Sequence, residues 1–128
     1  EAAELIELNR QKFGLDNICV VRALAPEGFE QLEAPSHAFI GGSGGRLSEI
    51  LWALYRKNPT VRVVVNAVSM ETICELKRLL AKLTVEEEEW VQVQVCRTQQ
   101  RGGYQMMHAE NPVWICAFSM REVKEDET

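Results

Sequence analysis

The feature that most constrains the fold is a glycine-rich segment between a short apolar run and a helical pattern. The apolar run covers residues 37–40, and Gly41-Gly42-Ser43-Gly44-Gly45 follows it directly. Leu47 then opens a run of apolar residues at helical spacing. This run stops at Asn58-Pro59 because the residue before a proline disfavours helical backbone. A strand, a glycine loop and a helix in this succession indicate an α/β fold with a parallel sheet.

The rest of the chain repeats the same two patterns. Apolar residues at helical spacing predict helices over residues 2–13, from Leu47 to Asn58-Pro59, and from Ser69 as N-cap to Leu83. Short apolar or alternating runs predict strands over residues 17–22, 37–40, 61–65, 91–96 and 112–118. Residues 29–32 are expected to form one helical turn, residues 86–89 a solvated acidic turn, and Arg101-Gly102-Gly103 part of a loop. This order predicts one α/β domain over residues 1–128, with a mostly parallel sheet that ends in an antiparallel strand pair.

Length and composition are those of a soluble domain. The chain has 128 residues, of which 46% are hydrophobic and 26% charged, and this excludes wholesale disorder. The formal net charge of −5 argues against a basic surface for nucleic acid. No apolar stretch reaches the roughly 18 residues of a membrane-spanning helix, and no signal-peptide pattern opens the chain. We therefore expect neither nucleic acid nor a membrane as a partner.

The cysteines and histidines show no ligand spacing. Four cysteines occur singly, at Cys19, Cys74, Cys96 and Cys116. We expect them to be free and buried as small apolar residues, which suggests a reducing compartment, the cytoplasm. The two histidines lie far apart in the sequence, so no metal site is expected.

The glycine segment is the main candidate for a binding site. Glycines let a ligand approach the backbone closely, and the unpaired N–H groups at the start of the following helix favour phosphate or carboxylate. The carboxyl end of a parallel strand is where open α/β sheets bind ligands. The segment matches neither the dinucleotide-binding fingerprint nor the Walker loop, since no Lys-Ser or Lys-Thr pair follows its last glycine. The same residues leave open a flexible turn with no ligand.

Five short motifs, taken in order, resemble those of one enzyme family. They are Asn9-Arg10-Gln11-Lys12-Phe13-Gly14, Ala25-Pro26-Glu27, Phe39-Ile40 with the glycine segment, Val65-Asn66-Ala67-Val68 with Glu71-Thr72, and Asn111-Pro112-Val113. Together they are similar to the decarboxylating precorrin-6Y methyltransferases of cobalamin biosynthesis, in the domain that acts on carbon 15. The resemblance implies a Rossmann-like class I methyltransferase fold that uses S-adenosylmethionine (SAM). It also implies methylation of a tetrapyrrole ring carbon with loss of carbon dioxide from an acetate side chain, and it leaves open whether that tetrapyrrole contains cobalt.

The resemblance further implies that the chain is the carboxyl-terminal part of the family's domain, truncated on its N-terminal side. Family members begin with a strand, a glycine-rich cofactor loop and a second strand ending in an acidic residue, all of which would precede Glu1. Most of the SAM site would then lie upstream, and this chain is expected to be inactive alone. Of the residues present, Ala25, Pro26 and Gly41 are expected to contact the cofactor. The remaining strands are expected in the spatial order 37–40, 61–65, 113–118 and 91–96.

The implied tetrapyrrole carries many carboxylates, so the expected substrate contacts are mostly hydrogen-bond donors. Backbone amides of the glycine loop come first, and arginines can add bidentate contacts. The expected substrate-binding residues are Gly41, Gly42, Ser43, Gly44, Gly45, Arg46, Asn66, Arg97, Arg101 and Tyr104. Each arginine taken alone is also open to a solvated surface role, and Asn66 to capping the following turn. No catalytic residue is assigned, because an electron-rich ring carbon can itself attack the methyl group while the protein positions it.

Two other functions stay open at this level. A non-enzymatic module could bind a nucleotide or another anion through residues 41–45, and an α/β interaction domain could carry the same glycine turn without a ligand. We also expect a homo-oligomer, since the apolar faces that the missing strands leave exposed would associate with another copy of the chain.

Overall fold

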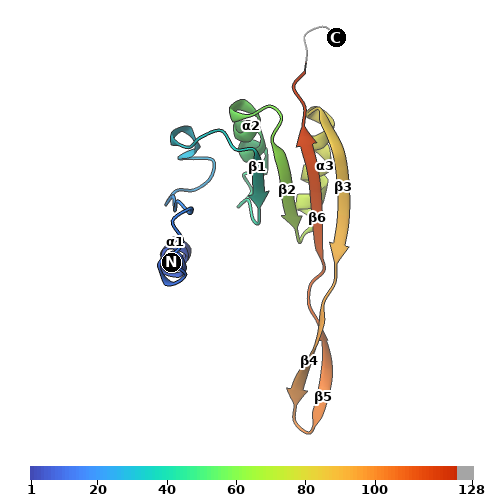
Figure 1. The fold of residues 1–128 in the computed structure, drawn as a ribbon. Helices are drawn as coiled ribbons and strands as arrows, with labels where there is room; N and C mark the ends of the chain where they lie inside the picture. The colour runs from blue at the N-terminus through green and yellow to red at the C-terminus, as the bar shows by residue number, and fades with distance from the viewer. Residues whose placement is uncertain (124–128) are drawn as a thin grey trace. The chain divides into compact units, whose positions relative to one another are not determined.

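The computed structural model describes residues 1–123, which fall into two compact units that divide after Leu32. Figure 1 shows their helices and strands. Every buried hydrophobic residue lies in the second unit, between Ile40 and Met120. Within the described residues, none of the helices has the length and apolar character needed to cross a membrane.

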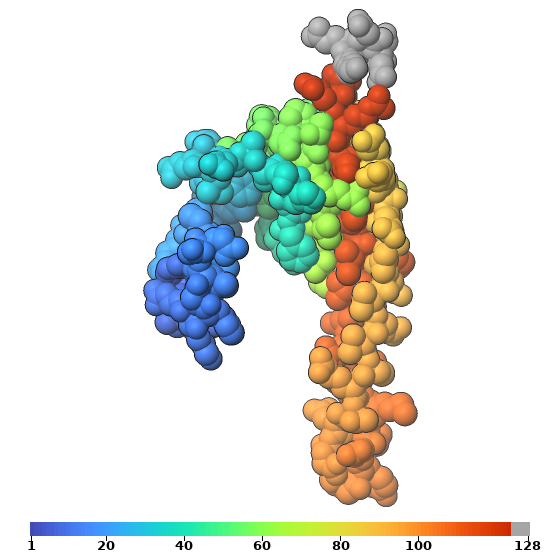
Figure 2. Space-filling model, in the orientation of Figure 1, coloured from blue at the N-terminus to red at the C-terminus, as the bar shows by residue number. Residues whose placement is uncertain are grey.

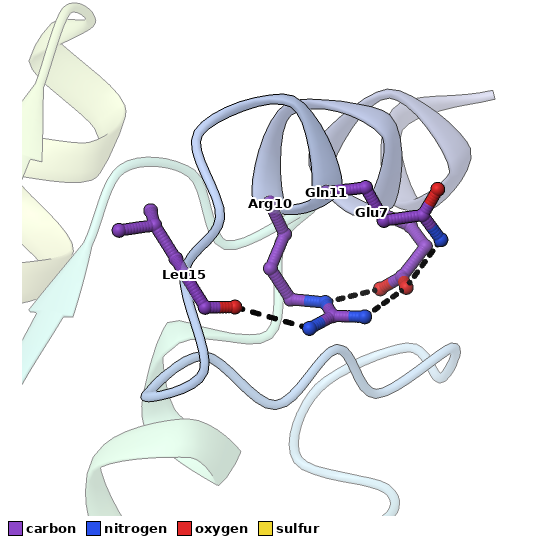
Figure 3. A network of polar contacts seen from close by, with 4 residues as sticks. All are labelled: Glu7, Arg10, Gln11 and Leu15. Atoms are coloured by element: carbon purple, nitrogen blue, oxygen red, sulfur yellow. Dashed lines mark hydrogen bonds and ion pairs between the residues drawn. The ribbon is translucent and has the colours of Figure 1, made fainter.

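The first unit begins with helix α1, Ala2–Lys12, which confirms the first predicted helix. Near its end, Arg10 Nε and Nη2 donate to the two carboxylate oxygens of Glu7 at 3.0 and 2.6 Å (Figure 3). The third guanidinium nitrogen, Nη1, donates to the carbonyl oxygen of Leu15 at 3.1 Å. The hydrogen bonds from Arg10 lower the pKa of Glu7. Gly14 supplies the positive φ of 63° with which the chain leaves the helix.

The strand predicted over residues 17–22 is wrong. These residues form no regular secondary structure, and Ile18 and Val21 are about 40% exposed instead of buried. A strand is stable only when another strand supplies its hydrogen bonds, and none lies within residues 1–32. The helical turn predicted further along is confirmed as a short 3₁₀ turn, η1, at Phe29–Gln31.

The second unit is built on a four-stranded sheet with the predicted order, β1-β2-β6-β3, but the strand predicted at residues 91–96 begins earlier and ends at Val93, before the separate strand that starts at Cys96. The strands of the sheet are β1 (His37–Ile40), β2 (Arg62–Ala67), β3 (Val85–Val93) and β6 (Val113–Met120). Strands β1 and β2 are parallel, and β6 is antiparallel to both β2 and β3. Three strands therefore point the same way (Figure 1), and the predicted antiparallel final pair is confirmed. The sheet is mixed, because β1–β2 is its one parallel pairing and the reversed strand β6 makes the other two antiparallel.

Two helices, α2 (Leu47–Lys57) and α3 (Met70–Lys82), lie on one side of this sheet (Figure 1). Strand β2 alternates between buried and half-buried residues because successive side chains of a strand point to opposite faces. The buried face of β2 packs with apolar residues of both helices and of β6. This core comprises Leu47, Ile50, Leu51 and Leu54 of α2, Leu76, Leu79 and Leu80 of α3, Val63, Val65 and Ala67 of β2, and Cys116, Phe118 and Met120 of β6, together with Ile40, Val61 and Leu83.

The acidic turn predicted at residues 86–89 is also wrong, because these residues belong to β3. The β3–β6 pairing starts at Val85 and shifts register between Glu86 and Glu89, as at a β-bulge. Two basic side chains form hydrogen bonds with residues of this acidic segment. Arg62 Nη1 donates to the Glu87 carbonyl oxygen at 3.2 Å, and Lys77 Nζ donates to Glu88 Oε1 at 2.7 Å.

The loop predicted around Arg101-Gly102-Gly103 is instead the tip of a β-hairpin. Its strands are β4 (Cys96–Arg101) and β5 (Tyr104–Ala109), which pair only with each other. Gly102 has the positive φ, 59°, of a two-residue hairpin turn. Every residue of both strands is exposed, and Figure 2 shows the hairpin, in orange, extending beyond the four-stranded sheet. The hairpin therefore depends on backbone pairing, since its side chains bury no core.

Candidate functional site

The glycine loop follows β1 and leads directly into α2. Ser43, Gly44, Gly45 and Arg46 form a tight turn, in which the Arg46 N–H donates to the Ser43 carbonyl oxygen at 2.9 Å. The φ angles of Gly44 and Gly45 are +56° and +81°. Two consecutive positive values define a mirror-image turn that residues with side chains rarely adopt. These two glycines are therefore required by the backbone of the turn itself.

The loop presents an open stretch of backbone. A Cβ atom added at Gly42, Gly44 or Gly45 would meet no heavy atom within 4 Å, leaving chain neighbours aside. Helix α2 begins here with no side-chain cap hydrogen bond at Arg46, so no cap covers the N–H groups of its first turn. This combination suits an anionic group of a ligand.

Arg46 is not simply a free donor beside the loop. Its Nη2 and Nε donate to Glu49 Oε2 at 2.7 and 3.1 Å. The ion pair places both a guanidinium and a carboxylate at the start of α2. A negatively charged ligand at the loop would therefore share Arg46 with Glu49.

Asn66 lies level with the start of the glycine loop. Ile40, the last residue of β1, is paired with Val65 in the parallel register, so Gly41 leaves β1 level with Asn66, which is the last residue but one of β2. The Oδ1 atom of Asn66 is buried and has no hydrogen-bond partner among the described residues. The sheet thus brings together two of the predicted site elements at the carboxyl ends of β1 and β2, where open α/β sheets bind ligands.

The other predicted substrate contacts gather on the hairpin instead. Arg97 Nε donates to Glu110 Oε1 at 2.6 Å. Arg101 is the register partner of Tyr104 at the turn, and Tyr104 is 76% exposed. These three residues belong to the two-stranded sheet, separate from the four-stranded sheet that carries the loop.

Two of the expected cofactor contacts, Ala25 and Pro26, belong to the first unit. Both are half-buried and are joined by a cis peptide bond. The segment is folded on itself, since the Glu27 N–H donates to the Leu24 carbonyl oxygen at 2.9 Å and the Phe29 N–H to that of Pro26 at 3.1 Å. Their contact with a cofactor stays a prediction.

One pocket was not anticipated from the sequence. It has a volume of about 380 Å³ and is lined by Met70, Ile73, Lys77, Trp90 and Trp114. Glu88 Oε1 accepts from Lys77 Nζ and from Trp90 Nε1, both at 2.7 Å, and these two hydrogen bonds lower the pKa of Glu88. The ring centroids of Trp90 and Trp114 are 6.4 Å apart. The signal in the sequence was one tryptophan in each of two strands, and their pairing became visible only in the sheet.

Within residues 1–123, no group of three or more His, Cys, Asp or Glu side chains is arranged to hold a metal ion. The site is therefore defined by backbone amides, an amide side chain and the start of a helix.

The sheet order, with its reversed strand β6 and a glycine loop at the carboxyl ends, is that of a class I SAM-dependent methyltransferase. A solved SAM-dependent O-methyltransferase of Thermotoga maritima matches with a TM-score of 0.68, over 96% of this chain and 47% of that one, at 15% identity. That likeness concerns the fold alone.

The chain belongs to the precorrin methyltransferase domain family, whose model matches residues 1–120. A protein of Pyrobaculum calidifontis named "probable cobalt-precorrin-6B C(15)-methyltransferase (decarboxylating)" is 34% identical over 116 residues, covering 90% of this chain and 59% of that protein. The crystal structure of precorrin-6y C5,15-methyltransferase from Geobacter metallireducens matches with a TM-score of 0.78 and 36% identity, over 89% of this chain and 60% of that one. The chain thus spans about three-fifths of the length of these relatives.

Proposed function

We propose that this chain is the carboxyl-terminal part of a cobalamin-biosynthesis enzyme that methylates carbon 15 of a precorrin and releases carbon dioxide from its acetate side chain. The observation that carries the proposal is the family match over residues 1–120. The relatives' names, which specify this reaction for those proteins, support it. We also propose that residues 1–128 belong to a single domain of the whole enzyme.

The residues present fit part of a SAM site. When bound, SAM supplies an electrophilic methyl group on a sulfonium. Gly41 is exposed at the end of β1, and its backbone would border the methionine end, while Ala25 and Pro26 would contact adenine. We assign the rest of the cofactor site to the part of the relatives that this chain does not span.

The glycine loop would bind carboxylates of the precorrin. Its open backbone accommodates a ligand at Gly42, Gly44 and Gly45, and the uncapped start of α2 favours negative charge. Arg46 would add a charged donor here. Arg97, Arg101 and Tyr104 would contact other side chains of the macrocycle from the hairpin, because the large ligand presents carboxylates around its rim.

The chain's task in the reaction would be to position the substrate. The ring carbon would donate an electron pair to the methyl carbon while the methyl–sulfur bond breaks and S-adenosylhomocysteine leaves. Loss of carbon dioxide would then return the electrons of the broken carbon–carbon bond to the macrocycle. Holding the acetate carboxylate on the loop amides would orient that bond, and orientation of this kind contributes several orders of magnitude in rate.

The test uses Gly44→Val in a protein of the relatives' full length that contains this chain. A β-branched residue at a φ of +56° strains the turn and occupies its open face. We expect methyl transfer and carbon dioxide release, followed together by mass spectrometry of the product, to fall at least about tenfold. We expect the protein to stay folded by circular dichroism.

Gly14→Val is the matched control, because Gly14 also has a positive φ (+63°) and open space around it but lies after α1. Equal activity losses in the two variants would contradict a binding role for the loop. Residues 1–128 alone are expected to bind SAM weakly or not at all, and tight binding in a calorimetric titration would contradict the division of the site.

We also propose a cytoplasmic homo-oligomer, as the resemblance led us to expect. The non-enzymatic anion-binding module and the ligand-free interaction domain are not favoured, because the family match covers nearly the whole chain. The anion-binding module would be supported instead if phosphate or a nucleotide bound at residues 42–45 and a tetrapyrrole did not change the affinity of that binding.

A further inference from the structure

The Asn66 side chain is an anomaly within the sheet. It interrupts the apolar run of β2, on the half-buried face that it shares with Arg62 and Val64. Asparagine is among the residues that strands disfavour, and its Oδ1 is buried without a hydrogen-bond partner in residues 1–123. Arg62 does not satisfy this oxygen, because its Nη1 donates to the Glu87 carbonyl oxygen and to Ser119 Oγ, both at 3.2 Å.

A buried carbonyl oxygen without a donor destabilises a folded protein, because the hydrogen bonds it makes to water in the unfolded chain are lost. An apolar β-branched residue would avoid this cost and would suit the strand better. Such exceptions call for an explanation. The position of Asn66, level with Gly41 at the carboxyl ends of β1 and β2, suggests one.

We propose that Asn66 Oδ1 accepts a hydrogen bond from a donor group of the bound ligand. This inference rests on the proposed function. The glycine loop offers N–H donors to anionic groups, whereas Asn66 offers an acceptor. The site thus selects a ligand that carries a carboxylate toward the loop and an N–H, ammonium or hydroxyl group toward β2.

Two molecules in the reaction carry such donors. SAM has an ammonium group and ribose hydroxyls, and a metal-free tetrapyrrole has ring N–H groups. Ionised carboxylates have no donor, and ring nitrogens bound to cobalt have lost theirs. The source of the donor is therefore open to experiment, while its chemistry is the same in both cases.

The test compares Asn66→Val with Asn66→Asp in a protein of the relatives' full length. Valine removes the acceptor, and aspartate keeps an acceptor but removes the NH₂ donor. The probes are S-adenosylhomocysteine, a metal-free tetrapyrrole polycarboxylate and its cobalt complex, each titrated by calorimetry. Thermal unfolding without ligand provides a second readout that does not depend on activity.

We expect Asn66→Val to raise the unfolding midpoint of the ligand-free protein by a few degrees, since it removes an unpaired buried oxygen. It should weaken binding of one probe about tenfold, whereas Asn66→Asp should bind that probe at least as tightly as the parent. A loss confined to S-adenosylhomocysteine identifies the cofactor as donor, and a loss confined to the metal-free tetrapyrrole identifies the ring N–H groups.

Val64→Thr is the matched control, on the same face two residues earlier, and should change neither binding nor the midpoint by much. A lower unfolding midpoint for Asn66→Val would show that Asn66 stabilises the fold and would contradict the inference. Weaker ligand binding by Asn66→Asp than by Asn66→Val would show that the ligand contacts the Asn66 NH₂ group and not its oxygen. Unchanged binding in both variants would also overturn the inference. If the parent protein binds no probe, the proposed function fails first, and the inference fails with it.

Discussion

At the scale of single residues, identical side chains have different chemistry because their surroundings differ. We expected all four cysteines to be buried, but only Cys116 is; Cys19, Cys74 and Cys96 are exposed. Burial raises the pKa of Cys116 to about 12, because removal from water penalises the thiolate. The expectation failed since Cys19 and Cys96 do not lie in buried strands, and Cys74 lies on the outer face of α3.

These surroundings predict a reactivity pattern for the thiols. Titration of the native chain with a thiol reagent at pH 8 should show three fast equivalents and one slow one, because only a thiolate reacts. The fourth should react fast after denaturation. Cys74→Ser should remove a fast equivalent and Cys116→Ser the slow one. Four fast equivalents in the native chain would contradict the burial of Cys116.

The same thiol makes stability depend on alkaline pH. Its ordinary pKa of 9.0 applies to the unfolded chain, and the folded value is about 12. The stabilising contribution is therefore complete below pH 9 and is lost as the pH rises toward 12.

At the scale of elements, the two helices of the second unit begin in different ways. Ser69 caps α3 as predicted, and its Oγ accepts from the Thr72 N–H at 3.2 Å. Helix α2 starts at Arg46 without a side-chain cap. An uncapped start beside a glycine loop suits a ligand, whereas the capped start of α3 is complete by itself.

Removing the Ser69 cap is expected to destabilise the fold. Ser69→Ala should lower the free energy of unfolding by about 1 kcal/mol, measured by urea denaturation. Ser48→Ala is the control, because Ser48 lies inside α2 and does not cap it. Equal effects of the two substitutions would mean that the Ser69 hydroxyl contributes nothing as a cap.

At the scale of the whole molecule, helices α2 and α3 cover one face of the sheet, and no helix among the described residues of the second unit covers the other. Phe39 of β1, which is paired with Val64, is 68% exposed on the uncovered side. Exposed apolar surface of this kind favours association. The expected homo-oligomer therefore has a physical basis in this face as well as in the resemblance.

A substitution at this face tests self-association of the chain. We expect sedimentation velocity to show concentration-dependent association of residues 1–128, and Phe39→Lys to reduce it several-fold. Phe13→Lys is a matched control, because Phe13 is 69% exposed but lies at the end of α1. A monomer at all concentrations, or equal effects of the two substitutions, would exclude the sheet face as the contact.

The sequence by itself determined the features that depend on near neighbours in the chain. Helical spacing located α1, α2 and α3, the Ser69 hydroxyl located a cap, and the glycine segment located the loop. The family resemblance added the strand order, which the sheet confirms. These features were readable because side-chain periodicity and turn chemistry are local properties.

Only the tertiary structure decided which segments pair with another strand and which polar atoms are buried away from water. Residues 17–22 have strand composition but no adjacent strand, whereas the acidic residues 86–89 lie within a strand because Glu86 and Glu89 pair with β6 on either side of the bulge. The hairpin at residues 96–109 and the unpaired oxygen of Asn66 were likewise invisible in the sequence. Hydrogen bonding between strands and burial are set by residues distant in the chain, so no local pattern could disclose them.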